Sequence, residues 1–319
     1  MSLFQNIRRH AAVARGDFGA MFRDVEIPPL PAAVSRLVAE VNHPEPDIER
    51  LAKLISSSPG LAAKVIKTVN SSFYSLRVPV DNVKRAVTLL GLDQVRALAI
   101  AFATMDALPT PATELFNPTI YWTDSLLRAT VVRSLARKDH NDQLGQIFTV
   151  SLLSDLAIPV LLDSWLDYYL PVFTEWQVTD RSLALIEREH FKWDHAQAGA
   201  WILQSWGFPD ELVCCLACHT LDWQAMLENG LEGTPVVPVA VASRFPSVAR
   251  ATPEKMQSFY HAARTWLDYD PQQLCAVLEE VRLAMTDVFD IFHLCDNSAA
   301  QCVEILTGMI ENLAQMEES

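Results

Sequence analysis

Residues 54–65 read Leu-Ile-Ser-Ser-Ser-Pro-Gly-Leu-Ala-Ala-Lys-Val, and this stretch decides the fold. It joins two segments in which apolar residues recur every three or four positions, as they do on one face of a helix. Asp47 is a suitable N-cap for the first segment, and Ser58 followed by Pro59 is a suitable start for the second. The stretch therefore predicts two α-helices joined by a tight turn of three serines.

The same periodicity extends outward along most of the chain. It predicts further helices over residues 83–90, 93–105, 121–137 and 144–156, around 199–206, and after Thr252-Pro253 and Asp270-Pro271. The one stretch with strand character, residues 235–241, contains Pro238, which would remove a hydrogen-bond donor from a central strand. We therefore predict an all-α fold.

Glycine is scarce, with 10 residues in 319. No short window holds the three glycines of a dinucleotide-binding loop, and no pair of glycines frames a phosphate-binding P-loop. These two classes of nucleotide-binding protein are therefore excluded, and the connections between helices are expected to be short.

The chain is acidic, because 25 Lys and Arg against 39 Asp and Glu give a net charge of −14. A nucleic-acid-binding surface needs clustered basic residues, and no such run is present, so direct nucleic-acid binding is not expected. No stretch has the roughly 18 consecutive apolar residues of a membrane span, and no secretory signal is recognisable at the N-terminus. We predict a cytoplasmic protein that does not associate with membranes.

The six cysteines all lie between Cys214 and Cys302, a distribution that does not suggest a disulfide framework. Residues 215–219 read Cys-Leu-Ala-Cys-His, which has the spacing of a c-type haem attachment motif. The alternative is a buried helix in which cysteine acts as a small apolar residue, and the neighbouring apolar residues favour it. We therefore predict no cofactor.

Several motifs in order resemble the HDOD family of bacterial signalling domains, which are helical relatives of the HD phosphohydrolases. They are Ile27-Pro-Pro-Leu-Pro-Ala-Ala-Val, residues 54–65, Val69-Asn-Ser-Ser-Phe-Tyr, Ala86-Val-Thr-Leu-Leu-Gly-Leu-Asp-Gln-Val-Arg, Leu152-Leu-Ser-Asp-Leu, Asp194-His-Ala-Gln-Ala-Gly-Ala-Trp-Ile-Leu and Trp206-Gly-Phe-Pro-Asp-Glu-Leu. The resemblance implies an HD-domain-like helical bundle over residues 23–220.

The proposed organisation has four parts. Residues 1–22 are a helical lead-in, and Pro109 and Pro111 divide the HDOD domain into lobes at about 23–108 and 114–220. Residues 221–319 form a C-terminal helical extension that packs on the core.

The resemblance also identifies the positions at which HD hydrolases bind metal, through a histidine, a His-Asp pair and a later aspartate. In this sequence they correspond to Asp124, Ser154-Asp155 and Ser243, while His195 remains and a double histidine has become His219-Thr220. The residual candidate ligands are Asp124, Asp155, His195 and His219.

A serine hydroxyl replaces imidazole poorly as a ligand for a transition metal, so we predict that hydrolysis is lost and that no metal is bound. The four residual ligands would then form hydrogen bonds within the helical core. Two alternatives stay open: a divergent metal-dependent phosphohydrolase, and a pocket that senses a nucleotide without catalysis.

The remaining candidate for function is a loop surface formed by Asn70, Ser71, Phe73 and Tyr74, whose aromatic residues could anchor a protein partner. The alternative is that Asn70 caps a helix and the two aromatic residues fold back onto the core. The family resemblance implies signalling partners, namely a sensor kinase, a cyclic-dinucleotide enzyme or a transcriptional regulator. No feature of the sequence selects among them or selects an oligomeric state.

Overall fold

The computed structural model describes residues 30, 32–41, 43, 45, 47–71, 74, 76–292 and 304–311. Over these residues the secondary structure is helical and contains no strand, which confirms the all-α prediction. The predicted lead-in at residues 1–22 and the side chain of Phe73 lie outside the described residues.

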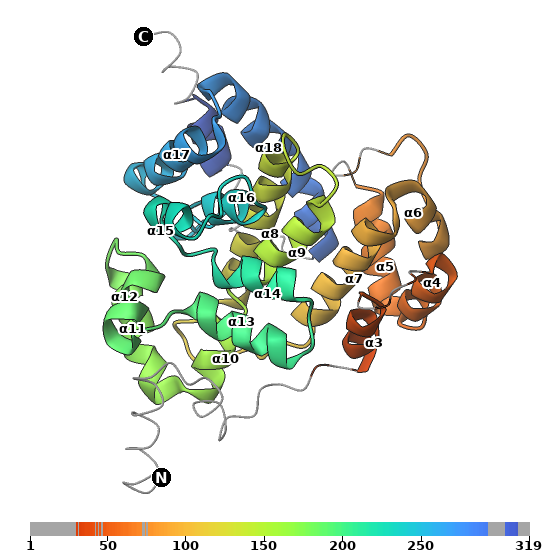
Figure 1. The fold of residues 1–319 in the computed structure, drawn as a ribbon, viewed down its shortest axis with the longest axis horizontal. Helices are drawn as coiled ribbons and strands as arrows, with labels where there is room; N and C mark the ends of the chain where they lie inside the picture. The colour runs from red at the N-terminus through yellow and green to blue at the C-terminus, as the bar shows by residue number, and fades with distance from the viewer. Residues whose placement is uncertain are drawn as a thin grey trace, which may run out of the picture.

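The first five described helices form the lobe at the right of Figure 1. They are α3 (Ala32–Val41), α4 (Ile48–Ser56), α5 (Pro59–Val69), α6 (Val83–Leu90) and α7 (Leu92–Met105). The predicted hairpin is α4 and α5, and Asp47 caps α4 by accepting a 2.8 Å hydrogen bond from the backbone N–H of Glu49. Gly91 separates α6 from α7 at a φ of 89°, which glycine adopts without the strain of a side chain.

The following seven helices build the centre and the lower left of the fold (Figure 1). They are α8 (Pro118–Ala136), α9 (Leu144–Leu153), α10 (Ala157–Ser164), α11 (Leu166–Val178), α12 (Leu183–Phe191), α13 (His195–Ser205) and α14 (Asp210–Ala217). The prediction that no stretch is long and apolar enough to cross a membrane was wrong for residues 144–164, which reach that threshold by length and composition. However, 94% of the most apolar 18-residue window in this stretch is buried inside the fold. This stretch is therefore part of the protein core.

The C-terminal part is also helical and contacts the earlier helices. It comprises α15 (Trp223–Glu228), α16 (Val236–Ala242), α17 (Pro253–Leu267), α18 (Pro271–Phe292) and a helix at residues 304–311. Helix α18 packs along α8 and also reaches α5 in the first lobe. Arg137 on the α8 side forms a 2.7 Å ion pair with Glu280, and the hydroxyl of Tyr269 donates to the carbonyl of Leu135 at 2.8 Å.

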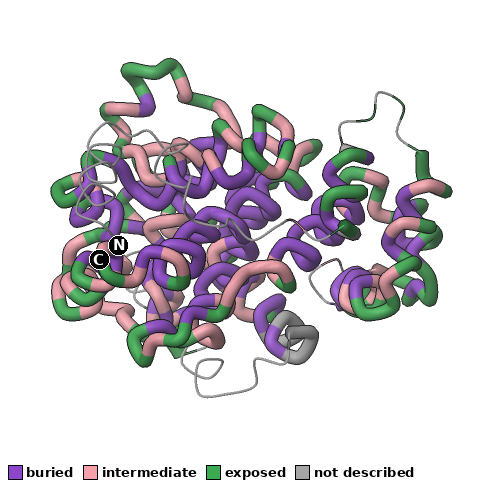
Figure 2. The backbone as a smooth tube through the Cα atoms, turned by 90° about the horizontal axis from the view of Figure 1, so that it is seen from below, coloured by how far each residue is buried: buried purple, intermediate pink, exposed green. Residues whose placement is uncertain are grey.

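Buried residues concentrate in the central helices, as the purple segments of Figure 2 show. Helix α8 packs along α9, and α9 in turn packs against α7 and α14. The α7–α9 crossing is tight at Gly145, where an added Cβ would lie 3.1 Å from the Cα of Gln94. Helix α9 therefore connects the first lobe to the rest of the fold.

Candidate functional site

Three of the four predicted residual ligands lie together in the core. One ligand atom from each of Asp155, His195 and His219 can be chosen so that all three lie within 4.8 Å of one another. The Oδ1 atom of Asp155 is 3.4 Å from Nε2 of His195 and 3.7 Å from Nε2 of His219. The three residues are only 8%, 6% and 1% exposed, so the cluster is enclosed by protein.

Helix ends hold these side chains in place. Asp155 lies in the turn between α9 and α10, and His195 is the first residue of α13. Asp194 caps α13 in a capping box: its carboxylate accepts from the Gln197 N–H at 3.2 Å, and the Gln197 side chain accepts from the Asp194 N–H at 3.2 Å. This reciprocal pair of hydrogen bonds fixes the start of α13 and therefore the position of His195.

A close approach of α13 and α14 brings the two histidines together. Gly199 lies at this approach, where an added Cβ would be 3.0 Å from Cδ2 of Leu216. His219 follows α14, and its Nδ1 donates to the carbonyl of Leu216 at 2.7 Å. The imidazole rings of His195 and His219 consequently lie 5.3 Å apart between centroids.

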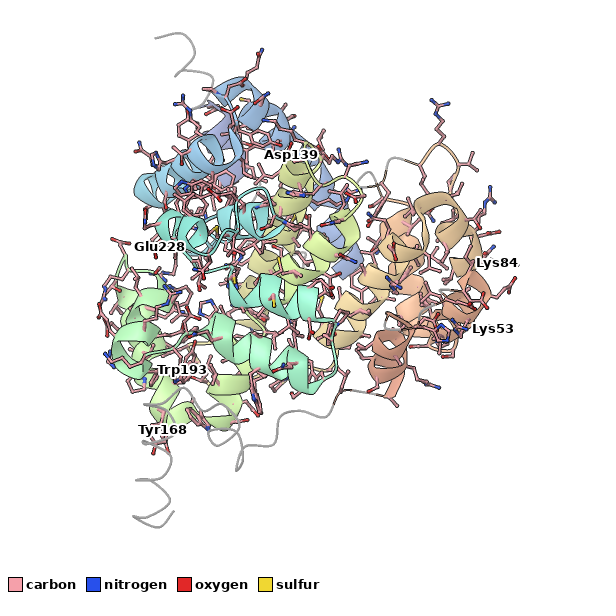
Figure 3. All side chains as sticks on the ribbon, viewed as in Figure 1. Lys53, Lys84, Asp139, Tyr168, Trp193 and Glu228 are labelled. Atoms are coloured by element: carbon pink, nitrogen blue, oxygen red, sulfur yellow. The ribbon has the colours of Figure 1, made fainter. Side chains whose placement is uncertain are left out.

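Aromatic packing supports the turn that precedes His195. Trp193, labelled in Figure 3, is 1% exposed and stacks on Phe191 with ring centroids 4.9 Å apart. It also contacts the ring of Trp165 edge to face at 6.4 Å. The α12–α13 connection is therefore anchored in the core and is not a mobile surface loop.

Glu187 of α12 orients the His195 ring. Its Oε2 accepts from Nδ1 of His195 at 2.6 Å and from the backbone N–H of His195 at 2.9 Å, and the hydroxyl of Tyr169 donates to its other oxygen. Burial opposes a positive charge on His195, but the carboxylates of Glu187 and Asp155 outweigh it and raise the pKa of His195 well above its ordinary value. These contacts favour the protonated form of His195, whose two ring nitrogens each face a carboxylate.

Arg128 of α8 neutralises Asp155 from the opposite side. Its Nη2 donates to Oδ2 of Asp155 at 2.6 Å, and the Asp155 side chain is 11% exposed. Burial alone would raise the pKa of Asp155, but Arg128 and the two imidazoles hold it well below its usual range. The cluster thus contains two carboxylates and two cations.

Asp124 does not join the cluster. Its Oδ1 accepts from the backbone N–H of Val248 at 2.8 Å, so it fastens the segment after α16 to α8. Burial raises the pKa of Asp124 to about 6, with Arg128 opposing the shift. Asp124 therefore forms a hydrogen bond within the helical core.

The three positions that the resemblance identified as degenerate, Ser154, Thr220 and Ser243, make internal hydrogen bonds. The hydroxyl of Ser154 donates to the carbonyl of Val150 and that of Ser243 to the carbonyl of Val239, each at 2.9 Å. The hydroxyl of Thr220 donates to Asp194 at 2.8 Å and accepts from Arg188 at 2.7 Å.

Sequence reasoning did not identify Arg128 or Glu187. A signal existed for Glu187, because it is a charged residue on the apolar face of its helix. Glu187 shares the buried face of α12 with Leu183, Ala184 and Phe191, and it is 0% exposed. A charge on such a face requires a partner in the core.

The loop after α5 is held against the fold. The side chain of Asn70 bonds the Val80 backbone twice, accepting from its N–H at 2.7 Å and donating to its carbonyl at 2.8 Å. The hydroxyl of Ser71 donates to the carbonyl of Thr68, and the guanidinium of Arg133 lies 4.6 Å from the centroid of the Tyr74 ring. Tyr74 therefore packs on α8, whereas the placement of Phe73 is outside the described residues.

The Cys-x-x-Cys-His stretch lies at the end of α14. Cys215 is buried, and burial raises the pKa of its thiol to about 12. Cys218 is partly buried, and His219 directs its imidazole to the Asp155 cluster. Within the described residues these cysteines form no metal-ligand group.

The donor atoms of the cluster fit a divalent metal in type and spacing. In both histidines Nδ1 faces an acceptor, which leaves Nε2 to face Asp155. Ligands of a metal at about 2.1 Å lie roughly 3–3.5 Å apart, close to the observed separations. Asp155, His195 and His219 would hold such an ion, and it would supply Lewis-acid activation of water. Arg128 and protonated His195 compete with it for the same carboxylate.

A family model described as the HDOD domain matches residues 27–221, which are 195 of the 319 residues. A sequence search of curated proteins finds no significant match. The fold resembles an HDOD domain protein with unknown function from Geobacter sulfurreducens, at 20% identity and a TM-score of 0.61 over 95% of this chain and 98% of that one.

Two further solved structures are similar. One is a "Putative phosphohydrolase" from Shewanella amazonensis SB2B, at 20% identity and a TM-score of 0.60 over 94% of this chain and 99% of that one. The other is a "Putative signal transduction protein" from Marinobacter aquaeolei VT8, at 21% identity and a TM-score of 0.59 over 95% of this chain and 66% of that one. At these identities the likeness concerns the fold alone. The family match and the helical fold confirm the predicted resemblance, and the chain belongs to the HDOD family.

Proposed function

We propose that this protein is a cytoplasmic, non-catalytic HDOD signalling protein that acts by binding other proteins. The observation that carries the proposal is the buried ion pair between Arg128 and Asp155. The guanidinium of Arg128 places a permanent positive charge beside Asp155, the carboxylate that both histidines face.

Charge compensation explains why this pair argues against hydrolysis. Asp155 and Glu187 contribute two negative charges, and Arg128 and protonated His195 contribute two positive charges. A divalent ion would have to displace the proton of His195 and share Asp155 with a guanidinium. Both steps cost free energy at a site that is already neutral.

Metal content and activity together test this part of the proposal. The full chain is purified without chelator, its manganese, iron and zinc are measured by mass spectrometry, and hydrolysis of bis(p-nitrophenyl) phosphate is assayed with added Mn²⁺. We expect substoichiometric metal and no hydrolysis above the protein-free rate. Stoichiometric metal together with hydrolysis that is lost in Asp155→Ala would overturn the proposal.

Protein partners are the other part of the proposal. The family suggests a sensor kinase, a cyclic-dinucleotide enzyme or a transcriptional regulator, and the acidic chain is poorly suited to bind nucleic acid directly. The loop that begins at Asn70 is the proposed contact surface, because two hydrogen bonds hold Asn70 against Val80 and so restrain the two ends of the loop, which lowers the entropic cost of binding.

A pull-down with the full chain, compared with Phe73→Ala, Asn70→Ala and the remote control Glu228→Gln, tests the loop. We expect a specific partner that Glu228→Gln retains and the two loop variants lose. Retention of that partner by both loop variants would remove the loop from the interface.

A metal-dependent phosphohydrolase is the second candidate function. Its support is the convergence of one carboxylate and two Nε2 atoms, a set that suits zinc, manganese or iron. The metal and hydrolysis measurements above decide between the two functions.

A further inference from the structure

A second candidate site shares no residue with the buried cluster. It is a groove of about 390 Å³ between α7 and the beginning of α14, with α9 as its floor. Helix α7 contributes a stripe of residues spaced three or four apart, α9 contributes Gln146 and Thr149, and α14 contributes its first turn. The volume is within the range of small-molecule sites.

The floor of the groove is rigid. The hydroxyl of Thr149 donates to the carbonyls of Ala97 and Gly145, at 3.1 and 2.9 Å, and so joins α9 to α7. The close crossing at Gly145 lies beside it. The groove is therefore formed before any ligand binds.

A buried arginine gives the groove its polarity. Arg96 is 8% exposed, and one of its nitrogens donates to Asp93 at 2.6 Å. Asp93 is the only hydrogen-bond partner of this guanidinium among the residues that the structure describes, and its own side chain is 63% exposed. A guanidinium with N–H donors to spare is suited to a ligand carboxylate, which it can bind through two parallel bonds.

The rim of the groove has the opposite charge. Asp93 and Glu211 both line it, and Glu211 is exposed at the start of α14. The remaining walls are aliphatic and include Ile100 and Leu212, both buried. A ligand with a single negative charge would meet two carboxylates, and a ligand with a single positive charge would meet Arg96.

We propose that this groove binds a small aliphatic zwitterion, either a free amino acid or a dipeptide. Its carboxylate bonds to Arg96, its ammonium group bonds to Glu211, and its aliphatic side chain contacts Ile100 and Leu212. Both charges of the ligand are then paired, and its apolar part leaves water. Binding connects α7 of the first lobe to α14 of the second.

Isothermal titration calorimetry on the full chain tests the proposal with L-leucine and leucyl-leucine. Isocaproate lacks the ammonium group and isoamylamine lacks the carboxylate, so these two analogues serve as matched ligands. We expect L-leucine or leucyl-leucine to bind at least about tenfold more tightly than either analogue. The better of the two zwitterions identifies whether the natural source is an amino acid or a dipeptide.

Variants locate the site. Arg96→Gln and Glu211→Gln should each weaken binding of the zwitterion about tenfold or more, while the remote controls Arg36→Gln on α3 and Glu228→Gln on α15 leave it unchanged. Gln146 is exposed on the floor, so Gln146→Trp should fill the groove and abolish binding without lowering the thermal midpoint. This variant keeps the test valid if Arg96→Gln fails to fold.

Three results would overturn the proposal. They are no heat of binding for either zwitterion at about 10 mM, binding of a singly charged analogue as tight as that of the zwitterion, and unchanged binding in folded Gln146→Trp.

Discussion

The Arg128→Met variant separates the two roles that Arg128 can have in the cluster. Removing one partner of a buried ion pair typically costs about 3–5 kcal/mol, because the other charge is left without compensation. Arg128 is 20% exposed and Asp155 is 11% exposed, so we expect the lower end, about 3 kcal/mol. For a chain of this size that corresponds to a fall of roughly 6 °C in the thermal midpoint.

The same substitution should improve metal binding. Methionine fills the space of the arginine stem without its charge, so Oδ2 of Asp155 loses its partner and the site becomes net negative. We therefore expect Zn²⁺ or Mn²⁺ to raise the thermal midpoint of Arg128→Met more than that of the wild type, because an ion that binds only the folded state stabilises it. Differential scanning fluorimetry with and without chelator measures both effects.

Two further variants make the result decisive. Arg128→Lys keeps a positive charge and should recover part of the stability while suppressing the metal response. Arg137→Met removes an exposed ion pair with Glu280 and should cost less than about 1 kcal/mol. The reasoning would be refuted if Arg128→Met were as stable as Arg137→Met in chelator, or if metal stabilised the wild type as strongly as Arg128→Met.

Four other substitutions test the fold around the two sites. Burial raises the pKa of Asp124 from 3.8 to about 6, so its charge destabilises the folded state above pH 6, and this effect disappears as the pH falls towards 4. In urea unfolding, the unfolding free energy of Asp124→Asn relative to that of the wild type should therefore rise by about 3 kcal/mol between pH 4 and pH 7.5. A difference that does not depend on pH would contradict this. Asn70→Ala should lower the unfolding free energy by about 2 kcal/mol, since it removes two hydrogen bonds to Val80, whereas a loss below about 0.5 kcal/mol would show that the loop is held otherwise. Gly145→Ala should destabilise the fold by about 1–2 kcal/mol, because the added Cβ meets backbone atoms of α7. Gly199→Ala should be nearly neutral, because its Cβ meets only the end of a leucine side chain. Equal thermal midpoints of the two variants would contradict the close α7–α9 crossing.

The helices were predictable because their signals are local. Asp47, the Ser58-Pro59 pair and Gly91 mark helix ends in the sequence, and each stands at a helix end in the structure. The periodic apolar residues between them require no knowledge of distant contacts. The absence of a strand at residues 235–241 followed from Pro238 in the same way, and this segment contains α16.

The candidate site was predictable only in part, because its partners come from separate helices. The family positions identified Asp155, His195 and His219, but the same alignment of motifs grouped Asp124 with them. A sequence does not reveal that the carboxylate of Asp124 bonds the backbone of Val248, 124 positions away. Arg128 and Glu187 are further examples, since their charges acquire a role only when α8 and α12 approach the turn at Asp155.

Two helices connect the groove to the buried cluster. The first two turns of α9 and the first turn of α14 border the groove, and the C-terminal ends of these helices lead to Asp155 and His219. At a rise of 1.5 Å per residue, Thr149 and Leu212 of the groove lie about 9–11 Å along the chain direction from Asp155 and His219. Helix α9 is pinned to α7 at Gly145 and Thr149, whereas α14 has few contacts with α7. A zwitterion that bonds Arg96 and Glu211 would thus link α14 directly to α7 and restrain the helix that precedes His219.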